Sequence, residues 1–398
     1  MFADRLQHLK TSGTTSARLA AEKAVASGKH LIDLTSGEVW CDTHPLIKTG
    51  AIKAIESNIN KYTHPLGILQ LRQTLAKVLS DDDNVPWSAE EIAVTSGAMQ
   101  ALFNTMMVLL NKGDEVILSL PYWSTYPAQI SLAGGIPVFI DTRDTHYKLT
   151  IEDIKRSLTS KTKIILVNTP SNPTGVLLDS LFLKQLAQIA EDNDIWIIFD
   201  QVYKDFIYDK SSEIHFLNLA PKIRNRTVLI NSLSKNLALT GWRLGFLAAP
   251  KSFVDQISIF QGNTTNNVNV ITQYAALEYL QSLGSTVNNV TFSQLLHSRD
   301  VAANELKMLH NKLISFNLPS GGLFIYFNFK MIFMNNALRD KLISIDNLVE
   351  LLITDIGVAC VSGNAFGDEY GLRVSIGAPT VNVKLGISRL VSFFNCLH

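Results

Sequence analysis

The sequence predicts an α/β fold, in which a mostly parallel central sheet lies between two layers of helices and a smaller α+β domain adjoins it. Two observations support this prediction. Short apolar runs alternate with longer helical patterns through the middle of the chain, and the last third mixes strands and helices in a different order. Strands that are apolar on both faces and separated by helices are typical of a parallel sheet covered on both sides.

The expected strands of the central sheet are short apolar runs bounded by turn residues. They are Glu91–Thr95, Glu115–Leu118, Ile136–Ile140, Lys163–Asn168, Ile195–Asp200 and Thr227–Ile230. Helical patterns lie between them, for example Ala98–Leu110 and Ser180–Asp192. Asp179 or Ser180 is a candidate N-cap of the second helix. Residues 91 to about 230 therefore predict one doubly wound unit.

The last third of the chain predicts the smaller domain. Helices are expected over Gln294–Phe316, near Asp346–Asp355 and from about Val381, and strands over Gly357–Val361 and Leu372–Ile376. We expect a large domain at residues 46–285 and a small domain formed by residues 1–45 and 286–398. The small domain thus combines an N-terminal helical segment with the C-terminal α+β part.

Composition excludes several classes of protein. The chain has 398 residues, of which 46% are hydrophobic and only 18% charged, so it can bury a large core and is not expected to be disordered. Lys and Arg number 35, and so do Asp and Glu. This balance lacks the basic character of a nucleic-acid-binding protein.

Membrane insertion and disulfides are not expected either. Two long uncharged stretches, residues 92–111 and 116–140, are interrupted by polar residues or prolines, so neither predicts a membrane span. The first residues lack the apolar core of a signal peptide. Cys41, Cys360 and Cys396 are odd in number and far apart, which predicts a reduced, cytoplasmic protein. The histidines have no metal-binding spacing, so no metal site is expected.

Polar residues follow the expected strands at their carboxyl ends, where parallel sheets bind ligands. Asn168 and Asp200 each close an apolar strand. The strand at Thr227–Ile230 leads into a hydroxyl-rich turn with Lys235, and Arg243 follows eight residues later. A lysine and an arginine in this setting predict an anion site that contains an amine.

These segments resemble the fold type I, pyridoxal-phosphate-dependent aminotransferases of class I/II, the aspartate aminotransferase-like group. The resemblance rests on Ser-Leu-Ser-Lys at 232–235, Thr-Gly-Trp-Arg at 240–243, Ser-Asn-Pro-Thr-Gly at 171–175 and the apolar strand that ends in Asp200. It runs from about Leu31 to Gly377. It implies an aminotransferase of amino acid metabolism and biosynthesis that moves an amino group from an amino acid to a 2-oxo acid, with pyridoxal 5'-phosphate as cofactor.

The resemblance also implies roles for the residues that match the family's motifs. Lys235 would form the Schiff base with the cofactor and shuttle the proton, which requires a neutral amine; a desolvated pocket with nearby cations favours that form. Asp200 would pair with the ring nitrogen of the cofactor. Tyr203 would donate a hydrogen bond to the ring hydroxyl, and both residues are expected to be catalytic. The full set of implied cofactor-binding residues is Gly97, Ala98, Met99, Trp123, Asn172, Asp200, Tyr203, Ser232, Ser234, Lys235 and Arg243, with Tyr62 reaching over from a neighbouring subunit.

Two further implications concern the substrate and the assembly. Arg373 matches the family arginine that binds the substrate α-carboxylate, and Gly37 and Asn172 match residues that assist it. Tyr62 matches a tyrosine that reaches the phosphate of the other subunit, so a homodimer is expected.

Some positions depart from the family pattern. Residues 37–41 read Gly-Glu-Val-Trp-Cys instead of Gly-Glu-Pro-Asp-Phe, and Met99 occupies a place where lysine is frequent. No second arginine is assigned to a substrate side-chain carboxylate, which argues against strict aspartate specificity. An alternative is therefore another fold type I reaction, such as elimination, cyclisation or oxidation of a modified amino acid. A transcriptional regulator fits less well, because the residues before Gly37 are too few and insufficiently basic for a DNA-binding domain. A nicotinamide-dependent oxidoreductase fits less well, because no Gly-x-Gly-x-x-Gly motif opens a helix.

Overall fold

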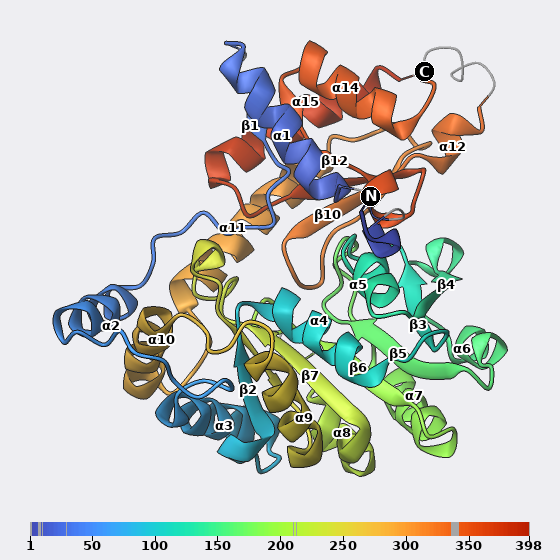
Figure 1. Ribbon diagram of the computed structural model, residues 1–398. Coiled ribbons are helices and arrows are strands. Elements are labelled where there is room, and N and C mark those ends of the chain that lie inside the picture. The colour runs from blue at the N-terminus through green and yellow to red at the C-terminus, as the bar shows by residue number, and fades with distance from the viewer. Residues whose placement is uncertain are drawn as a thin grey trace.

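The computed structural model describes residues 2–6, 9, 11–28, 30–209, 211, 213–335 and 342–397. Its elements form two units, which lie one above the other in Figure 1. The large unit contains the elements from residue 45 to residue 283, and the small unit contains those before residue 34 and after residue 288. Both ends of the chain lie in the small unit (Figure 1).

The large unit is built on a seven-stranded sheet with the strand order β2-β8-β7-β6-β5-β3-β4. Its strands are β2 (Ile92–Thr95), β3 (Glu115–Leu120), β4 (Ile136–Asp141), β5 (Thr162–Asn168), β6 (Trp196–Asp200), β7 (Thr227–Ser232) and β8 (Gly245–Ala248). All neighbours pair in parallel except β8, which is antiparallel to both β2 and β7. The parallel strands therefore end at one common edge of the sheet.

Helices cover both faces of this sheet because its strands are apolar on both sides. In β5, Ile165 and Val167 pack into one hydrophobic core, and Ile164 and Leu166 pack into another. The helices of the first core are α2 (Pro45–Glu56), α3 (Leu69–Asp83), α6 (Ile151–Ser157), α7 (Ser180–Asp192), α8 (Phe216–Leu219) and α10 (Val270–Leu283). Those of the second are α4 (Ala98–Leu109), α5 (Tyr126–Leu132) and α9 (Lys251–Gly262).

The small unit combines a four-stranded antiparallel sheet, β12-β13-β10-β9, with the parallel pair β1-β11. The strands are β1 (Ile32–Asp33), β9 (Ser315–Asn317), β10 (Phe324–Asn328), β11 (Val358–Ala359), β12 (Val361–Ser362) and β13 (Gly371–Ser375). Its helices are α1 (Gly13–Ala26), α11 (Asn289–Leu306), α12 (Lys330–Phe333), α14 (Ile345–Asp355) and α15 (Thr380–Asn395). Helix α1 packs against β12 and the 3-10 helix η7 (Gly363–Phe366), so the N-terminal segment completes the small unit (Figure 1).

The structure agrees with most of the expected elements and corrects two. Each expected strand of the central sheet is present as β2 to β7, whereas β8 was not predicted. The helix expected over Gln294–Phe316 ends at Leu306, and the segment beyond it is bonded to the C-terminal helix region, where Asn311 donates to the carbonyls of Phe394 and Leu397. The strand expected over Gly357–Val361 is divided into β11 and β12, which pair with different sheets. The domain boundaries stay a prediction.

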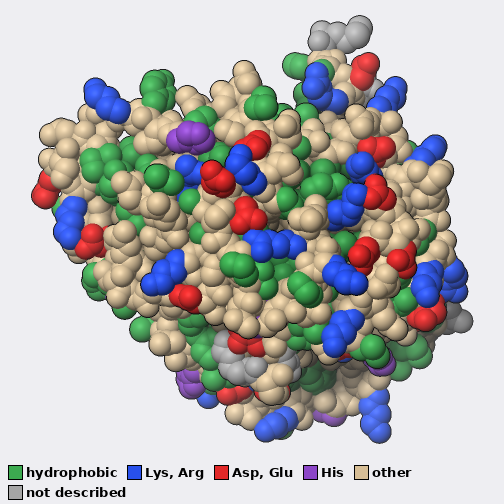
Figure 2. Space-filling view, turned by 90° about the horizontal axis from the view of Figure 1, so that it is seen from below, with side chains coloured by type: hydrophobic (Ala, Val, Ile, Leu, Met, Phe, Trp, Pro, Cys, Tyr) green, Lys and Arg blue, Asp and Glu red, His purple; other side chains and the backbone are tan. Residues whose placement is uncertain are grey.

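The surface carries charges of both signs. Figure 2 shows Lys and Arg side chains interspersed with Asp and Glu side chains on the face of the molecule seen from below, so neither sign dominates that face. No helix in the described part of the chain is long and apolar enough to cross a membrane.

The packing of α15 generates a test of the small unit's core. Phe394 is fully buried on α15, and its ring lies 5.3 Å from that of Phe327 and 5.0 Å from that of Phe329. We expect Phe394→Ala to lower the free energy of unfolding by about 3–5 kcal/mol, measured by urea denaturation. Val381→Ala, at a position of the same helix that is 71% exposed, should change it by less than about 0.5 kcal/mol. Equal effects of the two variants would contradict the packing described.

Candidate active site

A cavity of about 150 Å³ opens at the edge where the parallel strands end. Its walls come from the first turn of α4, from the ends of β5, β6 and β7, and from the segments that follow them. The lining residues are Ala98, Met99, Leu102, Trp123, Tyr126, Asn168, Asn172, Asp200, Val202, Tyr203, Ser232, Ser234, Lys235 and Arg243. Ligands of parallel sheets bind at this edge, so the fold itself marks the site.

Lys235 lies in the turn that follows β7. The buried side chains of Leu233 and Leu237 anchor this turn in the core, and the backbone N–H of Ser234 donates to Ser232 Oγ at 3.0 Å. The half-buried Lys235 side chain extends to the carbonyl oxygen of Gly37, to which Nζ donates at 2.7 Å. Local hydrogen bonds and apolar anchors thus fix the amine at the cavity.

The surroundings of Lys235 favour its neutral form. Burial is the largest cause that lowers the pKa of Lys235 from its ordinary 10.5 to about 8. The nearby carboxylate of Glu38 opposes this shift, and the Arg243 and Arg373 cations add to it. An amine with this pKa is partly neutral near pH 8, which a nucleophilic or proton-transferring lysine requires.

Asp200 is a buried carboxyl group at the end of β6, with 2% of its surface exposed. The Tyr126 hydroxyl donates to Oδ2 at 2.6 Å, and the backbone N–H of Val202 donates to Oδ1 at 3.1 Å. Burial raises the pKa of Asp200 to about 6 although both hydrogen bonds lower it. No cation forms an ion pair with Asp200 in the part of the chain that the structure describes, so a cationic group of a ligand would complete its environment.

Asn168 and Asn172 connect the strand ends to the opposite wall. Asn168 Nδ2 donates to the carbonyl of Asp200 at 3.0 Å, and its Oδ1 accepts from the backbone N–H of Asn172 at 2.8 Å. The side chain of Asn172 in turn accepts from Arg373 Nη1 at 3.1 Å. This chain of hydrogen bonds joins β5 and β6 of the large unit to β13 of the small unit.

Arg373 is a buried cation on β13, with 2% of its surface exposed. Nη2 donates to the carbonyl of Thr35 at 2.7 Å, Nε has no partner among the described residues, and the guanidinium carbon lies 4.0 Å from the centre of the Phe324 ring. Burial lowers the pKa of Arg373 to about 10. A buried guanidinium whose protein partners are neutral favours an incoming carboxylate, which it can bind through two hydrogen bonds.

A second cationic group borders the cavity at the start of α4. Gly97 caps this helix with φ of 78°, and a Cβ added there would lie 2.5 Å from Arg243 Nη2. Arg243 donates to the carbonyls of Thr240 and Ser96, at 2.9 and 3.4 Å, and no acidic side chain of the described residues pairs with it. The free N–H groups of the first helical turn and this guanidinium are suited to bind a phosphate.

The residues present fit pyridoxal phosphate. A carboxylate, an amine, hydroxyl groups and an anion-binding helix start line one cavity, together with the aromatic side chains of Trp123 and Tyr203. These are the groups that a flat, phosphate-bearing aldehyde with a basic ring nitrogen requires. No group of three or more His, Cys, Asp or Glu side chains that could hold a metal ion occurs among the described residues.

The structure brings almost all predicted site residues together. Those that line the cavity are Ala98, Met99, Trp123, Asn172, Asp200, Tyr203, Ser232, Ser234, Lys235 and Arg243. Gly97, Gly37 and Arg373 do not line it, but each contacts a residue that does, namely Arg243, Lys235 and Asn172. Tyr62 is not among the lining residues of this chain, and 87% of its surface is exposed.

Sequence reasoning missed several contributors. Tyr126, which donates to Asp200, lies only three residues after Trp123 in the same motif, but its partner is 74 positions away. The carbonyl of Thr35 and the ring of Phe324, which hold Arg373, carry no motif at all. Only the folded chain shows these partners.

Comparisons with known proteins agree with this arrangement. The family model described as aminotransferase class I and II matches residues 29–390. A probable aspartate/prephenate aminotransferase of Aquifex aeolicus (strain VF5) is 33% identical, over 98% of this chain and 97% of its own length. An aspartate aminotransferase of Bacillus sp. (strain YM-2) is 30% identical over 99% of both chains.

Solved structures give the same result. The aspartate aminotransferase from Thermotoga maritima has a TM-score of 0.90 and 30% identity, and the match covers 99% of this chain and 100% of that one. The aspartate aminotransferase from Thermus thermophilus with maleate also has a TM-score of 0.90, at 28% identity, with 98% and 99% covered.

The electrostatic setting of Lys235 predicts the pH dependence of its reactivity. Only the neutral amine reacts with an acylating reagent, so in cofactor-free protein the labelling rate of Lys235 should rise with pH through a midpoint near 8. Arg243→Gln removes a cation that lowers this pKa, and the midpoint should then move to higher pH. Mass spectrometry of the Lys235 peptide measures both curves. A midpoint at the ordinary value of 10.5 would show that the amine is not desolvated.

Proposed function

The chain belongs to the aminotransferase class I and II family, and from this premise we propose that Lys235 holds the cofactor and moves the proton of the reaction. The enzyme is a pyridoxal-phosphate-dependent aminotransferase, which moves an amino group from an amino acid to a 2-oxo acid. The family and the fold class predicted from the sequence are confirmed. One observation supports the role of Lys235: its amine lines the same cavity as the Asp200 carboxylate and the Arg243 guanidinium.

The cofactor, when bound, supplies an aldehyde that exchanges the amino group and a ring that draws electrons from the substrate α-carbon. We assign to Asp200 the task of holding a proton on the ring nitrogen. Its carboxyl is buried, already accepts from Tyr126 and Val202, and becomes more acidic beside a cation. Tyr203, which lines the same wall, donates to the ring hydroxyl in this assignment.

Lys235 is the general base and acid of the proposal. Its free, neutral amine would take the α-proton of the substrate at Nζ and hold it for the return transfer. A pKa near 8 keeps a useful part of this amine neutral close to neutral pH. The carbonyl of Gly37, which accepts from Nζ at 2.7 Å, orients the amine between these transfers.

The phosphate end is assigned to the first turn of α4 and to Arg243. The N–H groups of Ala98 and Met99 have no partner within the helix, and Arg243 adds a positive charge. Ser232 and Ser234 line the cavity beside them and supply hydroxyl groups. Trp123 is assigned to stack on the cofactor ring.

The substrate carboxylate is assigned to Arg373, with Asn172 and Gly37 beside it. Arg373 and Asn172 are already joined by a hydrogen bond of 3.1 Å, so the guanidinium is oriented before substrate arrives. The names of the relatives make aspartate the first amino donor to test. The segment 37–41, whose sequence departs from the family pattern, contacts Lys235 through Gly37 and belongs to the region that selects the substrate.

We also propose a homodimer in which Tyr62 reaches the neighbouring site. Exposed large apolar side chains gather in the stretch that contains it: Trp40, Ile52, Ile55, Tyr62 and Leu69. Helix α2, which carries two of them, packs on α10 at the edge of the molecule (Figure 1). Such a surface is typical of a subunit interface.

The three cysteines are all free, which supports a cytoplasmic location. A biosynthetic role in amino acid metabolism is also part of the proposal.

The role of Lys235 is tested by amino-group transfer from a panel of amino acids, aspartate included, to 2-oxo acids. We expect Lys235→Ala to lower kcat by at least about a hundredfold, because the proton-transferring group is lost. Lys23→Ala, on the exposed surface of α1, is the control and should leave kcat unchanged. Normal turnover by Lys235→Ala would show that Lys235 is not the proton-transferring group.

The role of Arg373 is tested by Arg373→Lys, which keeps the positive charge but removes the bidentate hydrogen bonding to a carboxylate. We expect KM for the amino acid to rise about tenfold, the equivalent of one charge-assisted hydrogen bond. Cofactor affinity, read by fluorescence titration, should stay the same because Arg373 does not line the cofactor cavity. An unchanged KM would place the carboxylate elsewhere.

The dimer is tested by sedimentation velocity and by Tyr62→Phe. The wild-type chain should sediment with twice its own mass, and the variant, still dimeric, should bind the cofactor more weakly through loss of one hydrogen bond to phosphate. A monomer with full cofactor affinity would contradict the proposal.

A further inference from the structure

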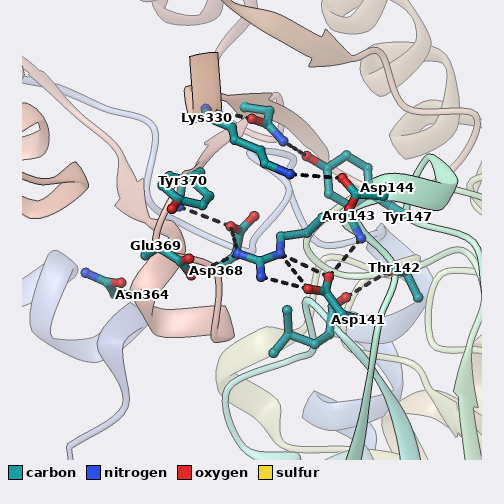
Figure 3. Close-up of polar contacts among 12 residues, drawn as sticks. Asp141, Thr142, Arg143, Asp144, Tyr147, Lys330, Asn364, Asp368, Glu369 and Tyr370 are labelled. Atoms are coloured by element: carbon teal, nitrogen blue, oxygen red, sulfur yellow. Dashed lines mark hydrogen bonds and ion pairs between the residues drawn. The ribbon is translucent and has the colours of Figure 1, made fainter. Parts of the chain in front are cut away.

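A cluster of charged side chains joins the two units beside the Arg373 strand (Figure 3). Arg143 begins the short 3-10 helix η3 (Arg143–Thr145), directly after β4 of the large unit. Its guanidinium pairs with Asp141 at 2.7 Å and reaches across to Glu369 of the small unit at 2.9 Å. Figure 3 shows Arg143 held between these two carboxylates, with Asp368 next to Glu369.

Asp368 is the buried member of this cluster. Its carboxylate is fully buried, and Arg143 Nη1 lies 3.5 Å from Oδ1. The backbone N–H of Tyr370 donates to the same oxygen at 3.1 Å, and the Tyr326 hydroxyl donates to Oδ2 at 3.0 Å. A buried carboxylate is tolerated only with such partners, and removing one of them is costly. Arg143 is thus the cation that balances a buried charge of the other unit.

Tyr326 connects this carboxylate to Arg373. The two residues are directly opposed in the antiparallel pair of β10 and β13, so their side chains share one face of the sheet. The ring of Phe366 closes the group: it lies 4.9 Å from the Arg373 guanidinium and 6.4 Å, edge on, from the Tyr326 ring. Arg373 is therefore packed against a tyrosine whose hydroxyl is fixed by Asp368.

The packing around the Tyr326–Asp368 bond leaves no room for adjustment. A Cβ added to Gly371, two residues before Arg373 on β13, would lie 1.9 Å from Tyr326 Oη and 2.8 Å from Asp368 Oδ2. The hydrogen bond thus lies directly over the strand that carries Arg373. A shift of Asp368 would be transmitted to β13, because close-packed interiors pass on displacements.

We propose that Arg143, Asp368 and Tyr326 are positioning residues that hold Arg373 at the distance from Lys235 that the substrate carboxylate requires. Arg143 belongs to the unit whose sheet carries Lys235, whereas Asp368 and Tyr326 belong to the unit that carries Arg373. The Arg143–Asp368 ion pair across the junction therefore sets the position of the Arg373 guanidinium relative to the Lys235 amine. This inference rests on the proposed function, in which Arg373 binds the α-carboxylate.

The same junction provides a matched control. Lys330 of the small unit pairs with Asp144 of the large unit at 3.1 Å, so it also joins the two units. The side chains of Lys330 and Asp144 are 35% and 85% exposed, respectively. This pair is not bonded to Asp368 or Tyr326. Exposed pairs contribute little, so Lys330→Met reports on loss of a junction ion pair without loss of the positioning contacts.

The test compares Tyr326→Phe, Arg143→Met and Lys330→Met as holoenzymes, with the amino acid that the panel identifies as donor. We expect Tyr326→Phe, which loses a hydrogen bond to the buried Asp368 carboxylate, and Arg143→Met, which loses the ion pair with that carboxylate, each to raise KM about tenfold, with kcat changed less than about threefold. Arg143→Lys should recover part of the loss. Lys330→Met should leave both constants unchanged, and the absorbance of the bound cofactor should be the same in all variants.

Two outcomes overturn the inference. If Tyr326→Phe, which keeps the ring and removes only the hydroxyl, has the KM of wild type, Asp368 does not position Arg373. If Arg143→Met lowers the thermal midpoint but leaves KM no higher than in Lys330→Met, the cluster is merely structural. Arg373→Lys separates these failures from failure of the proposed function: a raised KM there with normal values in the other variants rejects only the positioning role, whereas a normal KM in Arg373→Lys rejects both.

Discussion

In the proposed function, the chemistry depends on the burial of a single amine. Lys235 is carried to the edge of the parallel sheet by the turn after β7, where Nζ donates to the carbonyl of Gly37. Desolvation at that place lowers its pKa to about 8, so the neutral form that can react with a carbonyl group is available near neutral pH. The proton transfers proposed for Lys235 depend on this shift.

Around that amine the fold holds charges that are buried without ionic partners. Asp200 has only hydrogen-bond donors beside it, and the guanidinium of Arg373 faces neutral oxygens and an aromatic ring. Such groups are costly in a folded protein and are retained where a ligand compensates them. In the proposed function, the protonated ring nitrogen compensates Asp200 and the substrate carboxylate compensates Arg373. The neutral total charge of the chain conceals how unevenly its few important charges are placed.

The sequence predicted the residues that line the cavity better than it predicted the residues that hold them in place. Strand patterns and the motifs around Asp200, Lys235 and Arg243 were sufficient to place these residues at one cavity. They follow the carboxyl ends of strands, and the topology of a parallel sheet brings those ends to one edge. The sequence did not predict the hydrogen bond of Tyr126 to Asp200, nor the contacts of Asp368 with Arg143 and Tyr326. These contacts join positions far apart in the chain. Strand β8 has only four residues and begins two residues after Arg243, and the turn at Asn311 involves carbonyls near the C-terminus, far away in the sequence.

The central claim is that Lys235 is the lysine to which the cofactor is attached. The most direct measurement is reduction of the holoenzyme with borohydride, followed by proteolysis and mass spectrometry of the peptides. The account predicts that the mass of the reduced cofactor is found on the peptide that contains Lys235 and on no other. Attachment to a different lysine, with the Lys235 peptide unmodified in active enzyme, would contradict it.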